Sequence, residues 1–159
     1  MRRSRKQRGR RRRVRRSYRG GNLSTFTSMA PVKDGDVYTL VIGSTGKKFK
    51  VECVVSPEAI IQGLSGRPGL KEGAGMLFLF PELEIHSMWM PDMKFPLDVV
   101  WLDEQLSVVH ISYGLEPCKN TGDCPSTSSV YATKYAIEMV AGAAKKYGFQ
   151  TGQDLKVLL

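Results

Sequence analysis

The chain has 159 residues, 42% of them hydrophobic, and a formal net charge of +9, which is a globular composition and not that of a disordered protein. No apolar run approaches the roughly 18 residues that a membrane helix needs, so the sequence predicts no membrane span. The first charged residues are not followed by the apolar block of a secretory signal peptide, so we expect no secretion by that route.

The positive charge is concentrated at the N-terminus. Residues 1–20 hold eleven Arg and one Lys without an acid, whereas residues 21–159 hold the other twelve Lys and Arg against fifteen Asp and Glu. The net charge of +9 therefore divides into +12 for this segment and 12 − 15 = −3 for the rest. We divide the chain into a basic Arg-rich arm with a flexible joint (1–30) and a β-domain (31–159), because so dense a charge repels itself and buries nothing.

The arm is predicted to bind nucleic acid or another polyanion. Arginine presents a planar fork of donors that matches phosphate oxygens. If about twelve phosphates of duplex DNA were neutralised, the logarithm of the binding constant would fall with the logarithm of the salt concentration with a slope near −10, which we call the salt slope. The predicted binding residues are the cations of the arm: Arg2, Arg3, Arg5, Lys6, Arg8, Arg10, Arg11, Arg12, Arg13, Arg15, Arg16 and Arg19. The alternatives are a solvated tail, a nuclear-import-like signal and a cleaved transit peptide.

From residue 37 onward the pattern is that of strands. Residues 37–42 and 49–55 flank the turn "GSTGKK" and predict a β-hairpin. Ser56 and Pro57 then have the residue types of an N-cap and a first helical position, so a short helix is expected. The later elements are short strands at 76–80, 86–90, 97–102 and 107–114, a long loop at 115–130, a strand at 134–140, a short helix ending at Gly148, and a closing strand at 154–159.

This order of elements predicts a mainly β fold. Short strands at roughly 8–12-residue spacing favour a β-sandwich, jelly-roll-like or barrel-like single domain, with one or two short helices, preceded by the flexible arm.

The three cysteines are too few for a disulfide scaffold. Cys53 lies in the apolar run "FKVECVV" and is expected to be buried. Cys118 and Cys124 lie six residues apart in "EPCKNTGDCPS", where a disulfide, two unlinked thiols or half of a metal site are the alternatives. No second Cys or His pair has matching spacing, so we predict no metal site.

A candidate pocket comes from the polar and aromatic residues of the central segment: Arg67, His86, Trp89, Met90 and Asp98. Asp98 interrupts an apolar strand, and a buried carboxylate needs a partner, which Arg67 or His86 could supply. The simpler interpretation, which we favour, is that Asp98 accepts hydrogen bonds from loop backbone, His86 ends a strand and Trp89 packs in the core. No nucleophile accompanies these residues, so we predict no catalytic residue and no cofactor.

The order of motifs in the domain resembles a known family. "GLSGRPG", "GMLFLF", "HSMWM", "PLD", "PCKNTGDCPS" and "YAIEMVAGAAKKYGFQTGQD" follow one another as in the domain of unknown function 192, over residues of about 36–157. The resemblance implies a compact β-sandwich or jelly-roll-like fold and no assigned reaction. Pro91 and Asp92 stand where the family usually has Lys-Asn, and the arm stands where members often have a signal peptide.

Together these features favour a non-enzymatic structural or interaction protein. In this hypothesis the arm anchors the β-domain to nucleic acid, to a polyanionic surface or to other subunits of an assembly, such as a virion in which it would be a minor capsid protein. The expected location is a virion or an intracellular nucleoprotein assembly. The alternative is a small-ligand-binding protein or enzyme that uses the Arg67, His86, Trp89 and Asp98 region, with the arm as a localisation signal.

Overall fold

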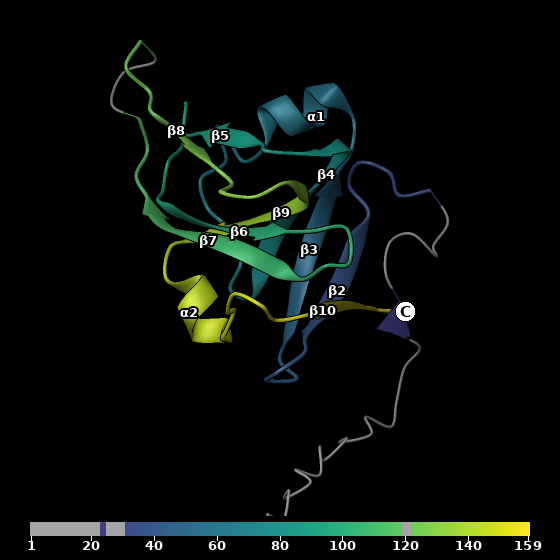
Figure 1. The fold of residues 1–159 in the computed structure, drawn as a ribbon. Coiled ribbons are helices and arrows are strands. Elements are labelled where there is room, and N and C mark those ends of the chain that lie inside the picture. The colour runs from purple at the N-terminus through teal and green to yellow at the C-terminus, as the bar shows by residue number, and fades with distance from the viewer. Residues whose placement is uncertain (1–22, 25–30, 119–121) are drawn as a thin grey trace, which may run out of the picture.

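The computed structural model describes residues 23–24, 31–118 and 122–159. Within them, eight strands form one strongly curled sheet and two more form a small separate sheet (Figure 1). The large sheet has the order β1 (Leu23–Ser24), β10 (Leu155–Leu158), β2 (Val37–Ile42), β3 (Lys48–Val54), β4 (Ala74–Glu84), β9 (Thr133–Val140), β6 (Leu97–Leu102) and β7 (Val108–Leu115). The small sheet pairs β5 (Ser87–Trp89) with β8 (Ser126–Ser128). The predicted mainly β class is confirmed.

Strands β3 and β4 form the parallel pair of the large sheet, and its other pairs are antiparallel. Parallel neighbours need a crossover, which here contains α1 (Pro57–Gln62). The helix begins as its sequence predicts, because the Ser56 side chain accepts a hydrogen bond of 3.2 Å from the Ala59 amide and Pro57 follows the cap. The second short helix, α2 (Ala143–Tyr147), ends at Gly148 with φ of 82°.

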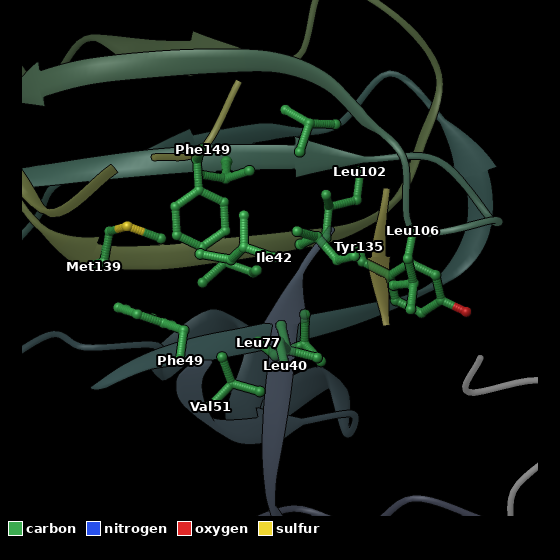
Figure 2. Packing of buried hydrophobic residues seen from close by; sticks show 14 of the residues in the cluster. Leu40, Ile42, Phe49, Val51, Leu77, Leu102, Leu106, Tyr135, Met139 and Phe149 are labelled. Carbon is green, nitrogen blue, oxygen red and sulfur yellow. The ribbon is translucent and has the colours of Figure 1, made fainter. Parts of the chain in front are cut away.

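The central strands are apolar on both faces because each face has its own core. One face carries the inner cluster, the residues enclosed by the curl of the sheet, where Phe49, Phe149 and Met139 meet in Figure 2. The other face carries the outer cluster, which includes Phe78 and Trp101 and is packed partly against residues of α1. In Figure 1, α1 and the small sheet lie together at one end of the large sheet and α2 lies at the other.

Three local features differ from the sequence-based expectations. Leu23 and Ser24, predicted to lie in a flexible joint, pair with Leu158 and Val157 of β10. Residues 115–130, predicted as one loop, include β8. Strand β4 continues through Pro81, where it was expected to stop, with an irregular register against β9 between Leu79 and Glu84. The twelve arm cations from Arg2 to Arg19 lie outside the described residues.

Candidate functional site

A cavity of about 360 Å³ opens on the outer-cluster side of the sheet. Its walls come from α1 and the loop after it, from β4 and from β5, and its lining is mostly apolar. The lining residues are Ile60, Ile61, Gln62, Gly63, Leu64, Ser65, Phe78, Phe80, Ser87, Met88, Trp89, Met93 and Glu138. This size and character are those of a small-molecule site, since such pockets commonly measure roughly 300–1,000 Å³. We call it the Trp89 pocket.

Glu138 of β9 is the ionisable residue of this lining. It is 5% exposed and stands between the apolar residues Ile137 and Met139 of the strand. Its Oε2 atom is buried and has no hydrogen-bond partner in the structure. Burial raises the pKa of the Glu138 carboxyl from an ordinary value of 4.5 to about 8. An unpaired buried carboxyl is costly and rare, which makes it the main chemical feature of the pocket.

The sheet register determines the neighbours of Glu138. It lies opposite Met76 of β4 on one side and Val99 of β6 on the other, and Met76 lies opposite Glu52 of β3. Residues paired in this way point to the same face of a sheet. Glu138 is therefore flanked by apolar side chains, and the next charged group in this row is on β3.

The turn after α1 closes over the carboxyl. Gly63 ends the helix with φ of 48°, in the left-handed region that favours glycine. A Cβ atom at this position would lie 3.2 Å from the Phe78 ring and 3.7 Å from Glu138 Oε2. The loop is also tied to the segment after β5, because Ser65 Oγ donates to the Pro91 carbonyl over 2.9 Å and the Gly66 amide donates to the Asp92 carbonyl over 3.0 Å. These bonds hold α1 and β5 on either side of the pocket.

Two large apolar side chains of the lining are exposed. Trp89 is 55% exposed and Ile61 is 74% exposed, whereas Met88, the neighbour of Trp89 in β5, is buried and packs into the outer cluster. Strand β5 produces this arrangement because successive side chains alternate between its faces. The expectation that Trp89 packs in the core is wrong. The tryptophan of the core is Trp101, whose indole N–H donates to Ser112 Oγ over 3.1 Å.

Arg67 does not contact Asp98. Its two terminal nitrogens each donate to one carboxylate oxygen of Glu52 over 2.8 Å, a bidentate pair. These hydrogen bonds lower the pKa of Glu52 below its ordinary value and raise that of Arg67. Arg67 therefore already has a partner on the outer face of the sheet.

Asp98 is buried and fully engaged with backbone. Its Oδ1 accepts from the Gly114 amide over 2.9 Å, and its Oδ2 accepts from the amides of Gly142 and Ala144 over 2.8 and 3.1 Å. Its register partner is Met139, a member of the inner cluster, so Asp98 points away from Glu138 and the Trp89 pocket. The suggested pairing with Arg67 or His86 is wrong, and the simpler interpretation of Asp98 is confirmed.

His86 and Met90 do not line the Trp89 pocket. The His86 ring stacks on Phe80 with centroids 3.8 Å apart, and its Nε2 lies 3.0 Å from the Glu82 carbonyl. Met90 is buried in the outer cluster. Of the five predicted pocket residues, Trp89 alone lines the Trp89 pocket.

The cysteines divide as two bonded and one free. Cys118 and Cys124 form a disulfide, one of the alternatives that the sequence left open. Cys53 is buried and unpaired, and burial raises the pKa of its thiol to about 12. Within residues 23–24, 31–118 and 122–159, no three His, Cys, Asp or Glu side chains gather as a metal-binding group. In the same ranges no helix has the length and apolar character to cross a membrane.

Sequence reasoning missed Glu138, although a signal was present. "AIEMV" places one carboxylate in an apolar run, as "PLDVVW" does for Asp98. The pattern indicates a buried acid in both cases but does not reveal which one has hydrogen-bond partners.

The fold and the pocket define a small β-domain with a ligand-sized hollow and one unpaired buried acid. The chain belongs to the DUF192 family, described as an uncharacterized ACR, whose profile matches residues 39–157. No curated protein matches the chain.

Solved structures similar to it include two bearing these descriptions. One is a Sinorhizobium meliloti protein described as a "putative transcription regulator", with a TM-score of 0.70 and 25% identity over 80% of this chain and 98% of that one. The other is a Novosphingobium aromaticivorans protein of unknown function, with a TM-score of 0.68 and 20% identity over 86% of this chain and 99% of that one.

Proposed function

We propose that the β-domain is a non-enzymatic ligand-binding module that takes a small, mainly apolar molecule into the Trp89 pocket. The observation that carries this proposal is the buried, unpartnered Glu138 carboxyl in the lining of a cavity of about 360 Å³. A carboxyl with a perturbed pKa in an apolar cleft is typical of a functional site. A bound ligand would supply the hydrogen-bond partner that the described residues of the chain do not provide.

The exposed Trp89 supports the same proposal. A large aromatic side chain that is 55% exposed contributes little to the core and offers apolar contact area to a ligand. Ile61 on α1 offers a second exposed apolar surface in the same lining. A ligand seated between them would cover apolar area that now faces water.

The test is a fragment screen of the full chain by ligand-detected NMR, repeated with Trp89→Ala and with Tyr131→Ala. Tyr131 is a matched control because it is 60% exposed and lies outside the pocket lining. We expect hits whose affinity falls at least about tenfold in Trp89→Ala and is unchanged in Tyr131→Ala. Hits that are indifferent to both changes would place binding elsewhere and contradict the proposal.

A second function is carried by the arm, which we propose binds nucleic acid or another polyanion without sequence readout. The supporting observation is the +12 charge of residues 1–20 against −3 for the remainder. Such an arm would suit a protein of an assembly such as a virion, in which the arm binds the nucleic acid and the β-domain faces outward.

The arm is tested by salt-dependent binding to duplex DNA and to polyacrylate. Replacing Arg10, Arg11, Arg12 and Arg13 by Gln should reduce the salt slope on DNA by about 4, because each neutralised phosphate contributes about 0.9. The matched control replaces four exposed lysines of the domain, Lys48, Lys50, Lys71 and Lys156, by Gln and should leave the slope unchanged. Equal losses in both variants would contradict an arm-specific interaction. Binding to polyacrylate as tight as to DNA would favour an acidic surface as the partner.

A further inference from the structure

We infer, building on the proposed ligand-binding function, that the Trp89 pocket selects an organic cation: a protonated amine with a compact apolar body, whose ammonium group pairs with Glu138. The inference names the ligand class of that same site. It follows from the charges of the lining, from the groups that surround Glu138, and from the aromatic walls.

The lining contains one acid and no base. Among the thirteen described residues that line the cavity, Glu138 is the ionisable side chain, and the remaining polar side chains are Gln62, Ser65 and Ser87. An anionic ligand would meet a carboxyl with no Lys or Arg to offset it. A protonated amine instead brings both the donors and the charge that the unpartnered Oε2 atom lacks.

The elements packed around Glu138 provide no counter-ion either. Strand β4 presents Met76, β6 presents Val99, and the turn after α1 presents Gly63, and none of these titrates. The charged pair on the same face, Arg67 with Glu52, is separated from Glu138 by β4, and both guanidinium donors on that side are taken by Glu52. Among the described residues no cation adjoins Glu138, so a ligand cation would supply the positive charge.

The walls also favour a cation with an apolar body. Trp89, Phe78 and Phe80 contribute three aromatic rings to the lining, and Met88 and Met93 contribute polarisable thioethers. Ring faces attract ammonium groups electrostatically, and thioethers fill irregular apolar space. A volume of about 360 Å³ admits an arylalkyl or branched alkyl amine and not a large polycation.

If this inference is right, the affinity for the amine depends on pH because binding is coupled to the ionisation of Glu138. Burial raises the pKa of Glu138 to about 8, so at pH 6.5 the carboxyl carries its proton while an alkylamine is already an ammonium ion. Formation of the ion pair transfers the Glu138 proton to the buffer. Affinity for the amine should therefore rise by up to about tenfold per pH unit below pH 8 and level off above it.

The experiment is isothermal titration of the full chain with phenethylamine, phenethyl alcohol and phenylacetate between pH 6 and 8.5, in two buffers of different ionisation enthalpy. We expect phenethylamine to bind at least about tenfold more tightly than the alcohol at pH 8 and to release about one proton at pH 6.5. Phenylacetate should bind most weakly. Glu138→Gln should abolish the proton release and the amine preference while keeping alcohol binding, and Glu104→Gln, in an exposed turn outside the lining, should behave as the parent chain.

The experiments distinguish a failure of the amine inference from a failure of the ligand-binding function. If the alcohol or phenylacetate binds as tightly as the amine, without proton release and with sensitivity to Trp89→Ala, the amine inference is overturned and the ligand-binding function stands. If none of the three probes binds and the fragment screen is also empty, the ligand-binding function itself is overturned.

Discussion

Glu138 and Glu52 lie on the same face of the sheet, two strands apart across Met76, and their surroundings move their pKa values in opposite directions. Two hydrogen bonds from Arg67 lower the pKa of Glu52, whereas burial without a partner raises that of Glu138 to about 8. The same residue type thus stabilises the sheet at one position and opposes folding at the other when ionised.

Glu138→Gln is expected to change how stability depends on pH. The folded-state pKa of about 8 exceeds the ordinary 4.5, so the folded protein holds a proton that the unfolded chain loses between these values. The contribution of Glu138 to stability is complete below pH 4.5 and is lost as pH rises to about 8, at up to about 1.4 kcal/mol per unit. Between pH 5 and pH 8, the free energy of unfolding of the variant, measured by chemical denaturation, should therefore rise by several kcal/mol relative to that of the parent.

Glu104→Gln serves as the control for this measurement because Glu104 is exposed. Its stability difference from the parent should stay constant over the same pH range. A Glu138→Gln difference that is equally flat would show that Glu138 is ionised in the folded protein at neutral pH.

The Arg67–Glu52 pair is expected to contribute modestly to stability. Both side chains are more than a third exposed, at 39% and 36%, so solvent screens the interaction. A double-mutant cycle with Glu52→Gln and Arg67→Gln should give a coupling of about 1 kcal/mol at pH 7, which the bidentate geometry places at the upper end for such pairs. Since the pKa of Glu52 is lowered on folding, its contribution is present above 4.5 and should fade as pH falls below that value. A coupling near zero at pH 7 would show that the pair is not maintained in solution.

Asp98→Asn is expected to destabilise the fold without altering the Trp89 pocket. An amide offers one acceptor oxygen in place of two. Either the Gly114 amide or the amides of the Gly142 turn would then face the NH₂ group of the asparagine and lose their acceptor. The cost should be roughly 2–3 kcal/mol in chemical denaturation. Asp123→Asn, on an exposed residue, should be neutral. Unchanged stability combined with lost ligand binding would instead assign Asp98 to the binding site.

The reactivity of the thiols toward a disulfide reagent tests the arrangement of the three cysteines. In the native, unreduced chain no thiol should react with an aromatic disulfide reagent, because Cys118 and Cys124 are bonded and Cys53 is buried with a pKa of about 12. Mild reduction should expose two reactive thiols and lower stability by about 2 kcal/mol, and denaturant should expose the third. In the Cys118→Ser, Cys124→Ser double variant, a native thiol that reacts rapidly would contradict the burial of Cys53.

Local chemistry predicted much of the fold. The β2–β3 hairpin, the Ser56 cap of α1 and the Gly148 end of α2 each follow from a few adjacent residues, so they were readable without knowledge of the rest of the chain. Strand β8 and the pairing of Leu23 with Leu158 were not, because each short strand exists through a partner about 40 or more residues away. Their own sequences, "STS" and "LS", carry little strand preference.

The sequence by itself determined the charge division, the mainly β class and the presence of two acids within apolar strands. The tertiary structure alone decided that these acids have different roles. Asp98 and Glu138 sit in neighbouring rows of the β6–β9 pair, and the alternation of side chains sends them to opposite faces. On one face three backbone amides surround Asp98, and on the other an apolar pocket encloses Glu138. Which face each acid occupies depends on a long-range register, and no local pattern of residues encodes it.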